Sequence, residues 1–187
     1  MEIPVYLFTG FLESGKSTFI REILSDENFT QDEKTLLLLC EEGIEEFDEV
    51  FLRRCNTVAV TIEDQNALTR TYCQLLTRKH RPDRVVIEYN GMWPTDTLDV
   101  AFPREWQLYQ VVNSINAETF EMYVNNMGAK MLGHIAFADL VVFNRCTDAA
   151  KAFIRSKNIR AMNPRATNFL EDTDGKSEDY AEDMQPP

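Results

Sequence analysis

Four residues near the start of the chain have the types and the spacing of a phosphate-binding loop. Gly10, Gly15, Lys16 and Ser17 satisfy the pattern G-x-x-x-x-G-K-[S/T], with an apolar run before it and an amphipathic segment after it. Glycines let successive backbone N–H groups point at a phosphate, and the N-terminus of the following helix adds positive potential. In this pattern the lysine contacts the β- and γ-phosphates and the serine hydroxyl reaches Mg²⁺. The motif therefore predicts a site for a nucleoside triphosphate with Mg²⁺.

The rest of the chain alternates short apolar runs with helix-length amphipathic segments. This alternation is typical of βα units around a parallel sheet that helices cover on both faces. In such sheets ligands bind at the carboxyl ends of the strands. The expected fold class is α/β: a doubly wound, mostly parallel sheet flanked by helices, as in P-loop NTPases. The sequence predicts strands at 3–9, 35–39, 57–61, 84–88, 108–115 and 140–144, and helices at 16–24, 45–53, 64–79, 117–126, 130–138 and 149–156.

The net charge and the cysteines exclude several kinds of partner. Lys and Arg number 19 against 31 Asp and Glu, which gives a net charge of −12. This charge repels nucleic-acid phosphates and anionic membranes, so we expect neither as a partner. The four cysteines lie far apart with no C-x-x-C pair, which indicates reduced thiols in a cytoplasmic protein. The apolar runs have the length of strands, so no membrane span is expected.

The length and a change of composition indicate one folded domain and a tail. A chain of 187 residues can bury one sizeable core, and we expect this nucleotide-binding domain over residues 1–170. Residues 171–187 contain seven acids, one lysine and a final Pro-Pro, with almost nothing apolar to bury. They are expected to form an acidic, disordered tail or linker.

The phosphate loop resembles the opening of the CobW-like family of P-loop GTPases, relatives of the nickel-insertion GTPases UreG and HypB. The family opening is similar to T-G-F-L-G-[A/S]-G-K-[S/T]-T, and residues 9–18 of this chain read TGFLESGKST. The resemblance covers nearly the whole chain to about Leu170, and it implies that Ser14 and Thr18 join the loop residues in holding the nucleotide. Glu13 replaces a glycine; a carboxylate there repels bound phosphates unless it points to solvent or to the metal.

A second segment fits the same family. Glu88 ends the apolar run 84–88, and Gly91 follows it, which matches the family's E-x-x-G at the end of the Walker B strand. The resemblance implies that Glu88 orients Mg²⁺ or its waters and that Gly91 lets the backbone approach the γ-phosphate. Together with Lys16, these two residues are the expected catalytic group.

The segment after the second predicted strand adds one more candidate. Cys40-Glu41-Glu42-Gly43 lies where the family has N-E-F-G. Glu41 is therefore expected to contact Mg²⁺, beside Ser17 and Glu88, or a transported metal. The segment through Glu49 is crowded with acids, and a solvated helix face is the alternative explanation for them.

The family's C-x-C-C metal motif is missing from this sequence. Alignment on the threonine that follows the motif places Thr57, Ala59 and Val60 at its cysteine positions, with only Cys55 nearby. Thiolates are the soft ligands that such a transfer site requires. We therefore expect no structural zinc, and we expect Cys55 to be a small buried residue.

Two segments near the end resemble the base-binding parts of the family. Asn144 and Arg145 match the start of N-K-x-D, in which Asn braces the base and its loop, the long cationic side chain stacks on the base, and Asp reads guanine. Thr147 occupies the Asp position, with Asp148 one residue later. Asn163 belongs to a segment similar to R-x-x-N-P-x-A, which the resemblance places on the other side of the base. GTP is thus the expected nucleotide, with ATP not excluded.

These features leave more than one function open. The first is a slow, Mg²⁺-dependent GTPase switch acting in metal-cofactor delivery or a related regulatory step, with a protein client or a second copy of the chain as partner. The second is a nucleotide-binding module with little turnover and relaxed base specificity, because Glu13, Thr147 and the missing cysteines remove parts of the family's machinery. A small-molecule kinase is a third alternative, but the sequence shows no arginine-rich lid.

Overall fold

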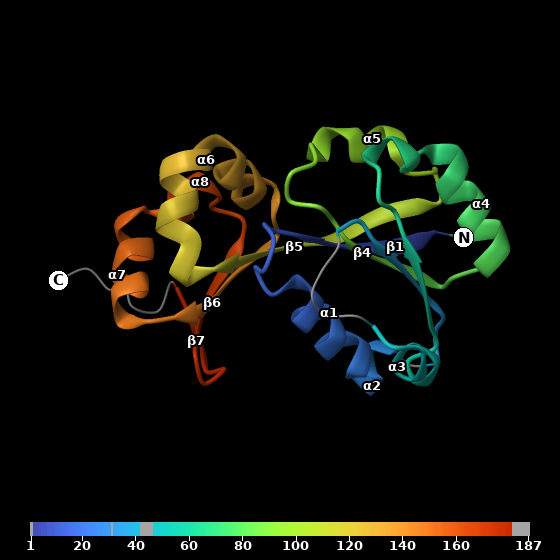
Figure 1. Ribbon diagram of the computed structural model, residues 1–187, viewed down its shortest axis with the longest axis horizontal. Coiled ribbons are helices and arrows are strands. Elements are labelled where there is room, and N and C mark those ends of the chain that lie inside the picture. Colours follow the sequence, from blue (N-terminus) through green and yellow to red (C-terminus); the bar gives the residue numbers. More distant parts are fainter. Residues whose placement is uncertain (1, 31, 42–46, 181–187) are drawn as a thin grey trace. The chain divides into compact units, whose positions relative to one another are not determined.

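The computed structural model describes residues 2–30, 32–41 and 47–180 (Figure 1). The chain consists of two compact units. Unit 1 contains Met1–Phe8 and Lys16–Tyr109, and unit 2 contains Thr9–Gly15 and Gln110–Pro187. The phosphate loop is therefore divided by chain position: Lys16 and Ser17 belong to unit 1, and the residues before them to unit 2.

Four parallel strands form the sheet of unit 1, in the order β3-β2-β4-β1. Leu37 in β2 and Val86 in β4 are fully buried, as are their neighbours along both strands. Continuous buried runs of this kind are expected where helices cover a parallel sheet on both faces. The strands are Ile3–Thr9 (β1), Thr35–Leu39 (β2), Thr57–Thr61 (β3) and Arg84–Glu88 (β4).

Helices lie on both sides of these strands. In Figure 1, α4 and α5 lie on one side and α1, α2 and α3 on the other. Asp48 accepts a hydrogen bond from the N–H of Phe51 (2.8 Å) and so starts α3, and Thr69 caps α4 in the same way. The helices are Lys16–Ser25 (α1), Glu27–Thr30 (α2), Glu49–Arg54 (α3), Arg70–His80 (α4) and Leu98–Ala101 (α5), with 3₁₀ turns at Gln65–Ala67 and Thr95–Thr97.

Unit 2 contains three parallel strands and one antiparallel strand, in the order β5-β6-β7-β8. Asn116 at the end of β5 pairs in register with Asn144 near the end of β6, so both lie at the carboxyl edge. Helix α6 packs against β6, α7 and α8. The elements are Trp106–Asn116 (β5, whose first four residues belong to unit 1), Ala117–Phe137 (α6), Leu140–Cys146 (β6), Asp148–Ser156 (α7), Ile159–Met162 (α8), Thr167–Asp172 (β7) and Ser177–Asp179 (β8).

The α/β fold class is confirmed, with mostly parallel strands and flanking helices. The first four strands begin and end where the sequence predicts, because each is a short run rich in apolar and β-branched residues; β1, β2 and β4 are also buried along most of their length. Among the described residues, none of the helices is long and apolar enough to span a membrane.

Four predicted helices differ in the structure by more than one residue. The helix expected at 45–53 begins at Glu49, because Asp48 caps it; residues 45 and 46 lie outside the described ranges. The helix expected at 64–79 is a 3₁₀ turn followed by α4, which begins only after its cap Thr69. The helices expected at 117–126 and 130–138 form one element, α6, with non-helical backbone at Met127 (φ −136°, ψ 32°).

The expected tail is ordered over its first ten residues, which corrects the boundary at residue 170. β7 continues to Asp172, and β8 pairs with it in an antiparallel hairpin whose turn contains Gly175 (φ 79°). Glu178 pairs with Lys151 (3.0 Å) and Arg155 (3.2 Å) of α7, and Tyr180 is 1% exposed. The acidic composition hid these pairings, because the bases lie in another element. Residues 181–187 lie outside the described ranges.

Candidate functional site

The unit 2 part of the phosphate loop has backbone that requires glycine at two positions. Gly10 has φ 137° and Gly15 has φ 94°, and L-residues rarely adopt such values. A Cβ on Gly10 would collide with the backbone oxygen of Ser114, and one on Gly15 would lie 2.5 Å from Nδ2 of Asn144. The two glycines thus allow the loop to pass close against the ends of β5 and β6.

Two side chains from these strand ends hold the loop. Nδ2 of Asn144 donates a hydrogen bond to the backbone oxygen of Ser14 (2.6 Å), and the hydroxyl of Ser114 donates to the same oxygen. The expected bracing of the loop by Asn144 is therefore present in the structure. Ser114 was missed by the sequence reasoning, because a serine within an apolar strand carries no signal of what it contacts.

The same bracing leaves buried polar atoms beside the loop. Since the backbone oxygen of Ser14 can only accept, it fixes Nδ2 of Asn144 toward the loop and Oδ1 away from it. Oδ1 of Asn144 and Oγ of Ser14 are buried and have no hydrogen-bond partner within the described part of the chain. Native proteins rarely leave such atoms unsatisfied, so both atoms fit a site that is completed by a polar ligand.

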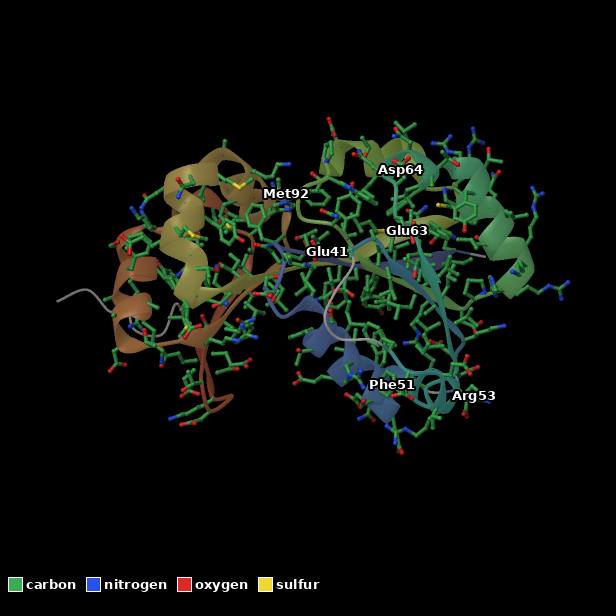
Figure 2. All side chains as sticks on the ribbon, in the orientation of Figure 1. Glu41, Phe51, Arg53, Glu63, Asp64 and Met92 are labelled. Atoms are coloured by element: carbon green, nitrogen blue, oxygen red, sulfur yellow. The ribbon has the colours of Figure 1, made fainter. Side chains whose placement is uncertain are left out.

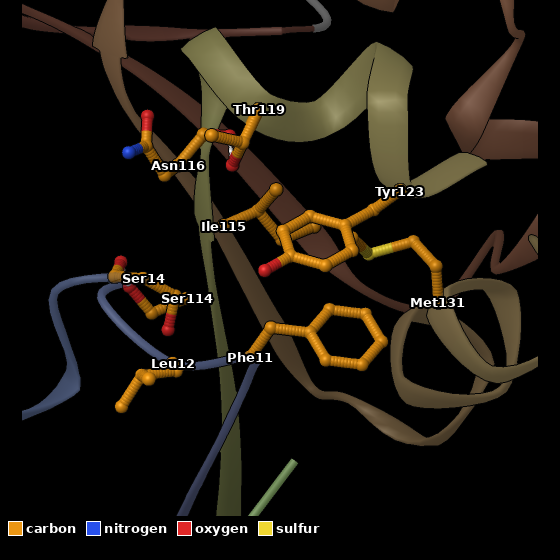
Figure 3. A pocket seen from close by; sticks show the side chains of 9 residues that line it. All are labelled: Phe11, Leu12, Ser14, Ser114, Ile115, Asn116, Thr119, Tyr123 and Met131. Atoms are coloured by element: carbon orange, nitrogen blue, oxygen red, sulfur yellow. Dashed lines mark hydrogen bonds between the residues drawn. The ribbon is translucent and has the colours of Figure 1, made fainter. Parts of the chain in front are cut away.

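A small hollow with an accessible volume of about 10 Å³ lies next to this loop in unit 2 (Figure 3). The ring of Phe11 stacks on that of Tyr123 in α6, with centroids 4.5 Å apart and an interplanar angle of 12°. Phe11 is only 4% exposed, so its ring anchors the loop to α6 by packing. The other residues that line the hollow include Leu12, Ser14, Ser114, Asn116 and Thr119.

In unit 1, the structure brings together two of the expected Mg²⁺ ligands. The hydroxyl of Ser17, in the first turn of α1, donates a hydrogen bond to Oε1 of Glu88 at the end of β4 (2.6 Å). Glu88 is 4% exposed. A hydroxyl and a carboxylate side by side provide the oxygen ligands that Mg²⁺ prefers in proteins.

The loop lysine contacts the third expected metal ligand. Nζ of Lys16 lies 2.6 Å from Oε2 of Glu41, and the side chains are 2% and 10% exposed. Glu41 follows β2 by two residues, and the N–H of Cys40 donates to the backbone oxygen of Glu88 (2.9 Å), which ties the ends of β2 and β4 together. The Glu41 carboxylate therefore forms an ion pair with the ammonium of Lys16.

Glu13, which replaces a glycine of the family's loop, is exposed to solvent. Its side chain is exposed and its φ is 58°, which is left-handed backbone that costs a non-glycine residue about 1–2 kcal/mol. This conformation explains why a glycine suits the position, and the side chain that replaces it is exposed. Thr18, the last residue of the motif, is exposed on α1.

Gly91 lies buried in a turn after β4. Asn90 shapes this turn, since its Oδ1 accepts from the N–H of Met92 (2.8 Å) and its backbone oxygen accepts from the N–H of Trp93 (3.0 Å). The buried Tyr89 donates its hydroxyl to the backbone oxygen of Pro94 (2.6 Å). The two positions that E-x-x-G leaves open are thus the ones that hold the turn in place.

Arg145 and Thr147, at the positions expected to contact the base, lie at the end of β6 and the start of α7. Arg145 is exposed, with φ 55° at a register shift between Phe143 and Cys146. Thr147 is the N-cap of α7, and its hydroxyl accepts from the N–H of Ala150 (3.2 Å). This hydroxyl can still donate its O–H and accept one further hydrogen bond, but it carries no charge to offer to a base.

The structure does not bring Asn163 together with Asn144. Nδ2 of Asn163 donates to the backbone oxygens of Ile135 (2.9 Å) and Ala138 (2.7 Å), at the end of α6 and just before β6. Asn144 lies near the other end of β6. The expected contact of Asn163 with the base does not fit this position, because the loop before a parallel strand lies at the amino edge of the sheet, opposite the edge of Asn144.

The cysteines are all buried and free. Cys55 ends α3 as its C-cap, and β3 contains the three positions aligned with the missing motif. Burial raises the pKa of the Cys40 thiol well above its usual range, that of Cys73 to about 12 and that of Cys146 to about 11. Among the described residues, no group of three or more His, Cys, Asp or Glu could hold a metal ion. The absence of structural zinc in the protein stays a prediction.

Comparisons with known proteins agree with this fold. The family described as CobW/HypB/UreG, nucleotide-binding domain, matches residues 4–170. A zinc chaperone CobW from a Sinorhizobium species is 32% identical over 114 residues, a match that covers 54% of this chain and 31% of that protein, so the chain spans less than a third of this relative's length.

Two solved structures share the fold at 20% identity. The hydrogenase maturation factor HypB from Archaeoglobus fulgidus has a TM-score of 0.64, with 92% of this chain and 82% of that one covered. The Zn(II)-bound YjiA GTPase from E. coli has a TM-score of 0.65, with 91% and 58% covered. The chain belongs to the CobW/HypB/UreG family of nucleotide-binding domains.

Proposed function

We propose that the chain binds a nucleoside triphosphate with Mg²⁺, prefers GTP, and hydrolyses it slowly as a switch in metal-cofactor delivery or a related regulatory step. The observation that carries the proposal is the hydrogen bond between the Ser17 hydroxyl and the Glu88 carboxylate (2.6 Å). It joins the loop hydroxyl to an acid at a strand end, which is the arrangement that Mg²⁺ and phosphates use in P-loop proteins. The relatives' descriptions as GTPase and zinc chaperone support the choice of nucleotide and of process.

The residues present fit Mg²⁺ and a triphosphate. Ser17 and Glu88 would hold the ion, which when bound supplies positive charge to the phosphate oxygens. Lys16 neutralises the β- and γ-phosphates, and the loop N–H groups, with Ser14 and Thr18, surround them. Gly91 gives the following backbone room to approach the γ-phosphate. The unpartnered Oγ of Ser14 supports a polar ligand at the loop.

The base is the less specific part of the proposal. Oδ1 of Asn144 is a buried acceptor without a partner among the described residues, and the exposed guanidinium of Arg145 can stack on a purine. No carboxylate stands at position 147. We therefore propose that guanine is preferred over adenine by a smaller margin than an intact N-K-x-D would give.

A second function is favoured by one observation. The Thr147 hydroxyl caps α7 and stands where a guanine-reading carboxylate would be, which supports a nucleotide-binding module with relaxed base specificity. Steady-state hydrolysis measured beside equilibrium binding separates the two functions. Tight binding with turnover equal to that of buffer would favour the module.

The partners and location belong to the proposal as well. We propose a protein client, or a second copy of the chain, as the partner that reads the nucleotide state, in the cytoplasm. The net charge of −12 supports neither a nucleic acid nor an anionic membrane as partner. The metal that is served is proposed only by analogy with the relative described as a zinc chaperone.

We predict that Lys16→Ala abolishes or severely weakens triphosphate binding while the protein stays folded. The ammonium of Lys16 is the only side-chain cation in the loop, and charge-assisted contacts to phosphate are strong. Calorimetry with Mg²⁺ and a non-hydrolysable GTP analogue tests this, with circular dichroism as the folding check. Lys79→Ala, which removes an exposed lysine from the same unit, is the matched control. Unchanged affinity in Lys16→Ala would show that the loop does not hold phosphate.

A further inference from the structure

We propose that Glu41 is an internal competitor of the triphosphate: its carboxylate occupies Lys16 in the nucleotide-free protein, and nucleotide binding must displace it. The inference rests on the proposed function, because it concerns the same lysine. Nζ of Lys16 and Oε2 of Glu41 are 2.6 Å apart, and the side chains are 2% and 10% exposed. The contact is therefore a close, largely buried ion pair and not a surface pair, whose contribution would be small.

The triphosphate and the Glu41 carboxylate compete for the same Lys16 ammonium. A triphosphate at the loop places several negative charges around the Lys16 ammonium, within a few ångströms of the Glu41 carboxylate. At such distances and with water largely excluded, the like charges of the carboxylate and the phosphates repel each other strongly. The nucleotide therefore gains its contact with Lys16 only at the expense of the existing ion pair, and the strength of that pair lowers the affinity for nucleotide.

The other role considered for Glu41, as a ligand of Mg²⁺, has the opposite consequence. The Mg²⁺ ligands that the structure pairs are Ser17 and Glu88, whereas the Glu41 carboxylate contacts an ammonium. Neutralising a metal ligand weakens the binding of Mg²⁺-nucleotide. Neutralising a competitor strengthens it. The sign of the effect therefore decides between the two roles.

The aromatic contacts between α1 and the segment around α3 do not include Glu41. The guanidinium of Arg21 on α1 lies over the ring of Phe51 in α3 (4.9 Å) and over that of Phe47 (5.6 Å). Figure 2 labels Phe51 on α3 and Glu41 beyond β2. These aromatic contacts hold α1 against α3, and they do not involve the charge of Glu41.

The first experiment measures the affinity of Glu41→Gln for a non-hydrolysable GTP analogue with Mg²⁺ by calorimetry. Glutamine keeps the size and one hydrogen bond but removes the charge, and a charge-assisted hydrogen bond is roughly twice as strong as a neutral one. We expect about tenfold tighter binding than in the wild type, equal to about 1.4 kcal/mol. Glu49→Gln is the control, because Glu49 is 90% exposed in the same unit and pairs only loosely with Arg53 (3.7 Å). It removes the same net charge and should leave the affinity unchanged.

A thermal double-mutant cycle without nucleotide tests whether the gain comes from the ion pair. Glu41→Gln should lower the Tm of the nucleotide-free protein, since it leaves the buried Lys16 ammonium less well compensated. In the Lys16→Ala background the same substitution should not lower the Tm. A Tm loss of equal size in both backgrounds would overturn the inference.

The outcomes separate this inference from the proposed function. Wild type and Glu41→Gln binding the analogue with equal affinity would overturn the competition alone, and weaker binding by Glu41→Gln would assign the carboxylate to the metal. Tighter binding by Glu49→Gln to the same degree would reduce the effect to net charge and also overturn the competition. If neither wild type nor Glu41→Gln binds the analogue, the proposed function fails together with the inference.

Discussion

Thr147 occupies a position of a base-binding motif but has the role of a helix cap. Its position is that of the guanine-reading acid in N-K-x-D, yet its oxygen accepts from the N–H of Ala150 and starts α7. Threonine is a good N-cap, so the element is satisfied while the base loses an acceptor. The hydroxyl can still donate one hydrogen bond and accept one more, so it can face either purine and does not favour guanine in particular.

We predict that Thr147→Asp widens the ratio of GTP to ATP affinity by about tenfold. Aspartate caps helices as well as threonine does, so one carboxylate oxygen can keep the Ala150 contact while the other accepts from guanine. A bidentate base contact discriminates by roughly 1–3 kcal/mol in DNA recognition, which serves as an analogy. Side-by-side titration of GTP and ATP analogues with Mg²⁺ measures the ratio. Thr147→Asn, which also caps but carries no charge, is the control.

The result for the wild type bears on the same prediction. If the wild type already prefers GTP by more than about a thousandfold, equivalent to roughly 4 kcal/mol, the base is read by other groups. The account of position 147 would then be wrong, whatever Thr147→Asp does.

At the scale of elements, Asn144 and Asn163, which the sequence both assigned to the base, lie at opposite ends of strand β6. Asn144, near its carboxyl end, donates to the phosphate loop (2.6 Å). Asn163 fixes the connection at its amino end, where Nδ2 donates to backbone oxygens at the end of α6 and Oδ1 accepts from the N–H groups of Arg165 and Ala166, both at 3.2 Å. Asn144 therefore holds the phosphate loop, and Asn163 holds the chain segment before β7 against the end of α6.

We predict that Asn163→Ala lowers the free energy of unfolding by about 3 kcal/mol and leaves nucleotide affinity unchanged. The substitution leaves buried backbone groups without partners, each of which costs about 1–3 kcal/mol. Chemical denaturation measures the first effect, and calorimetry on the folded variant measures the second. Asn144→Ala is the matched comparison and should weaken nucleotide binding. Weakened binding in Asn163→Ala with unchanged stability would restore its expected role at the base.

At the scale of the whole chain, charge and thiols set the conditions under which the site works. A net charge of −12 repels an anionic nucleotide at long range, so its binding must depend on the loop N–H groups and Lys16 at short range. The cysteines are all buried, and burial raises the pKa of three of them, to about 12 for Cys73 and about 11 for Cys146. At neutral pH these three stay protonated, whereas metal ligation requires the thiolate.

We predict that the purified protein holds far less than one zinc per chain. Thr57, Ala59 and Val60 provide no thiolate, and Cys55 alone cannot complete a tetrahedral site. Elemental analysis after dialysis tests this prediction, with a known zinc protein carried through the same steps as the control. About one zinc per chain would contradict it and would direct attention to Cys55 and Glu41 as ligands.

The sequence by itself determined the phosphate loop, the strands of unit 1 and the fold class, because these depend on local spacing: two glycines, a lysine and a serine in one loop, and short apolar runs between amphipathic segments. The resemblance to the family's E-x-x-G and N-K-x-D also pointed to Glu88 and Asn144, each at or near the end of a strand. Only the tertiary structure decided what these side chains contact. Asn144 and Ser14 are 130 positions apart, and Ser17 and Glu88 are 71 apart.

The same limit explains the expectations that had to be corrected. Asn163 was assigned to the base from its motif, but its partners are backbone oxygens 25 to 28 positions earlier, at the opposite end of β6. Residues 171–187 were expected to be an acidic tail, but Lys151 and Arg155 on α7 pair with Glu178 there. Glu41 was a metal candidate; its carboxylate contacts Lys16 in the structure, and its role at a metal stays a prediction. In each case residue type limits the partners that a side chain can accept, and the packing of distant elements selects among them.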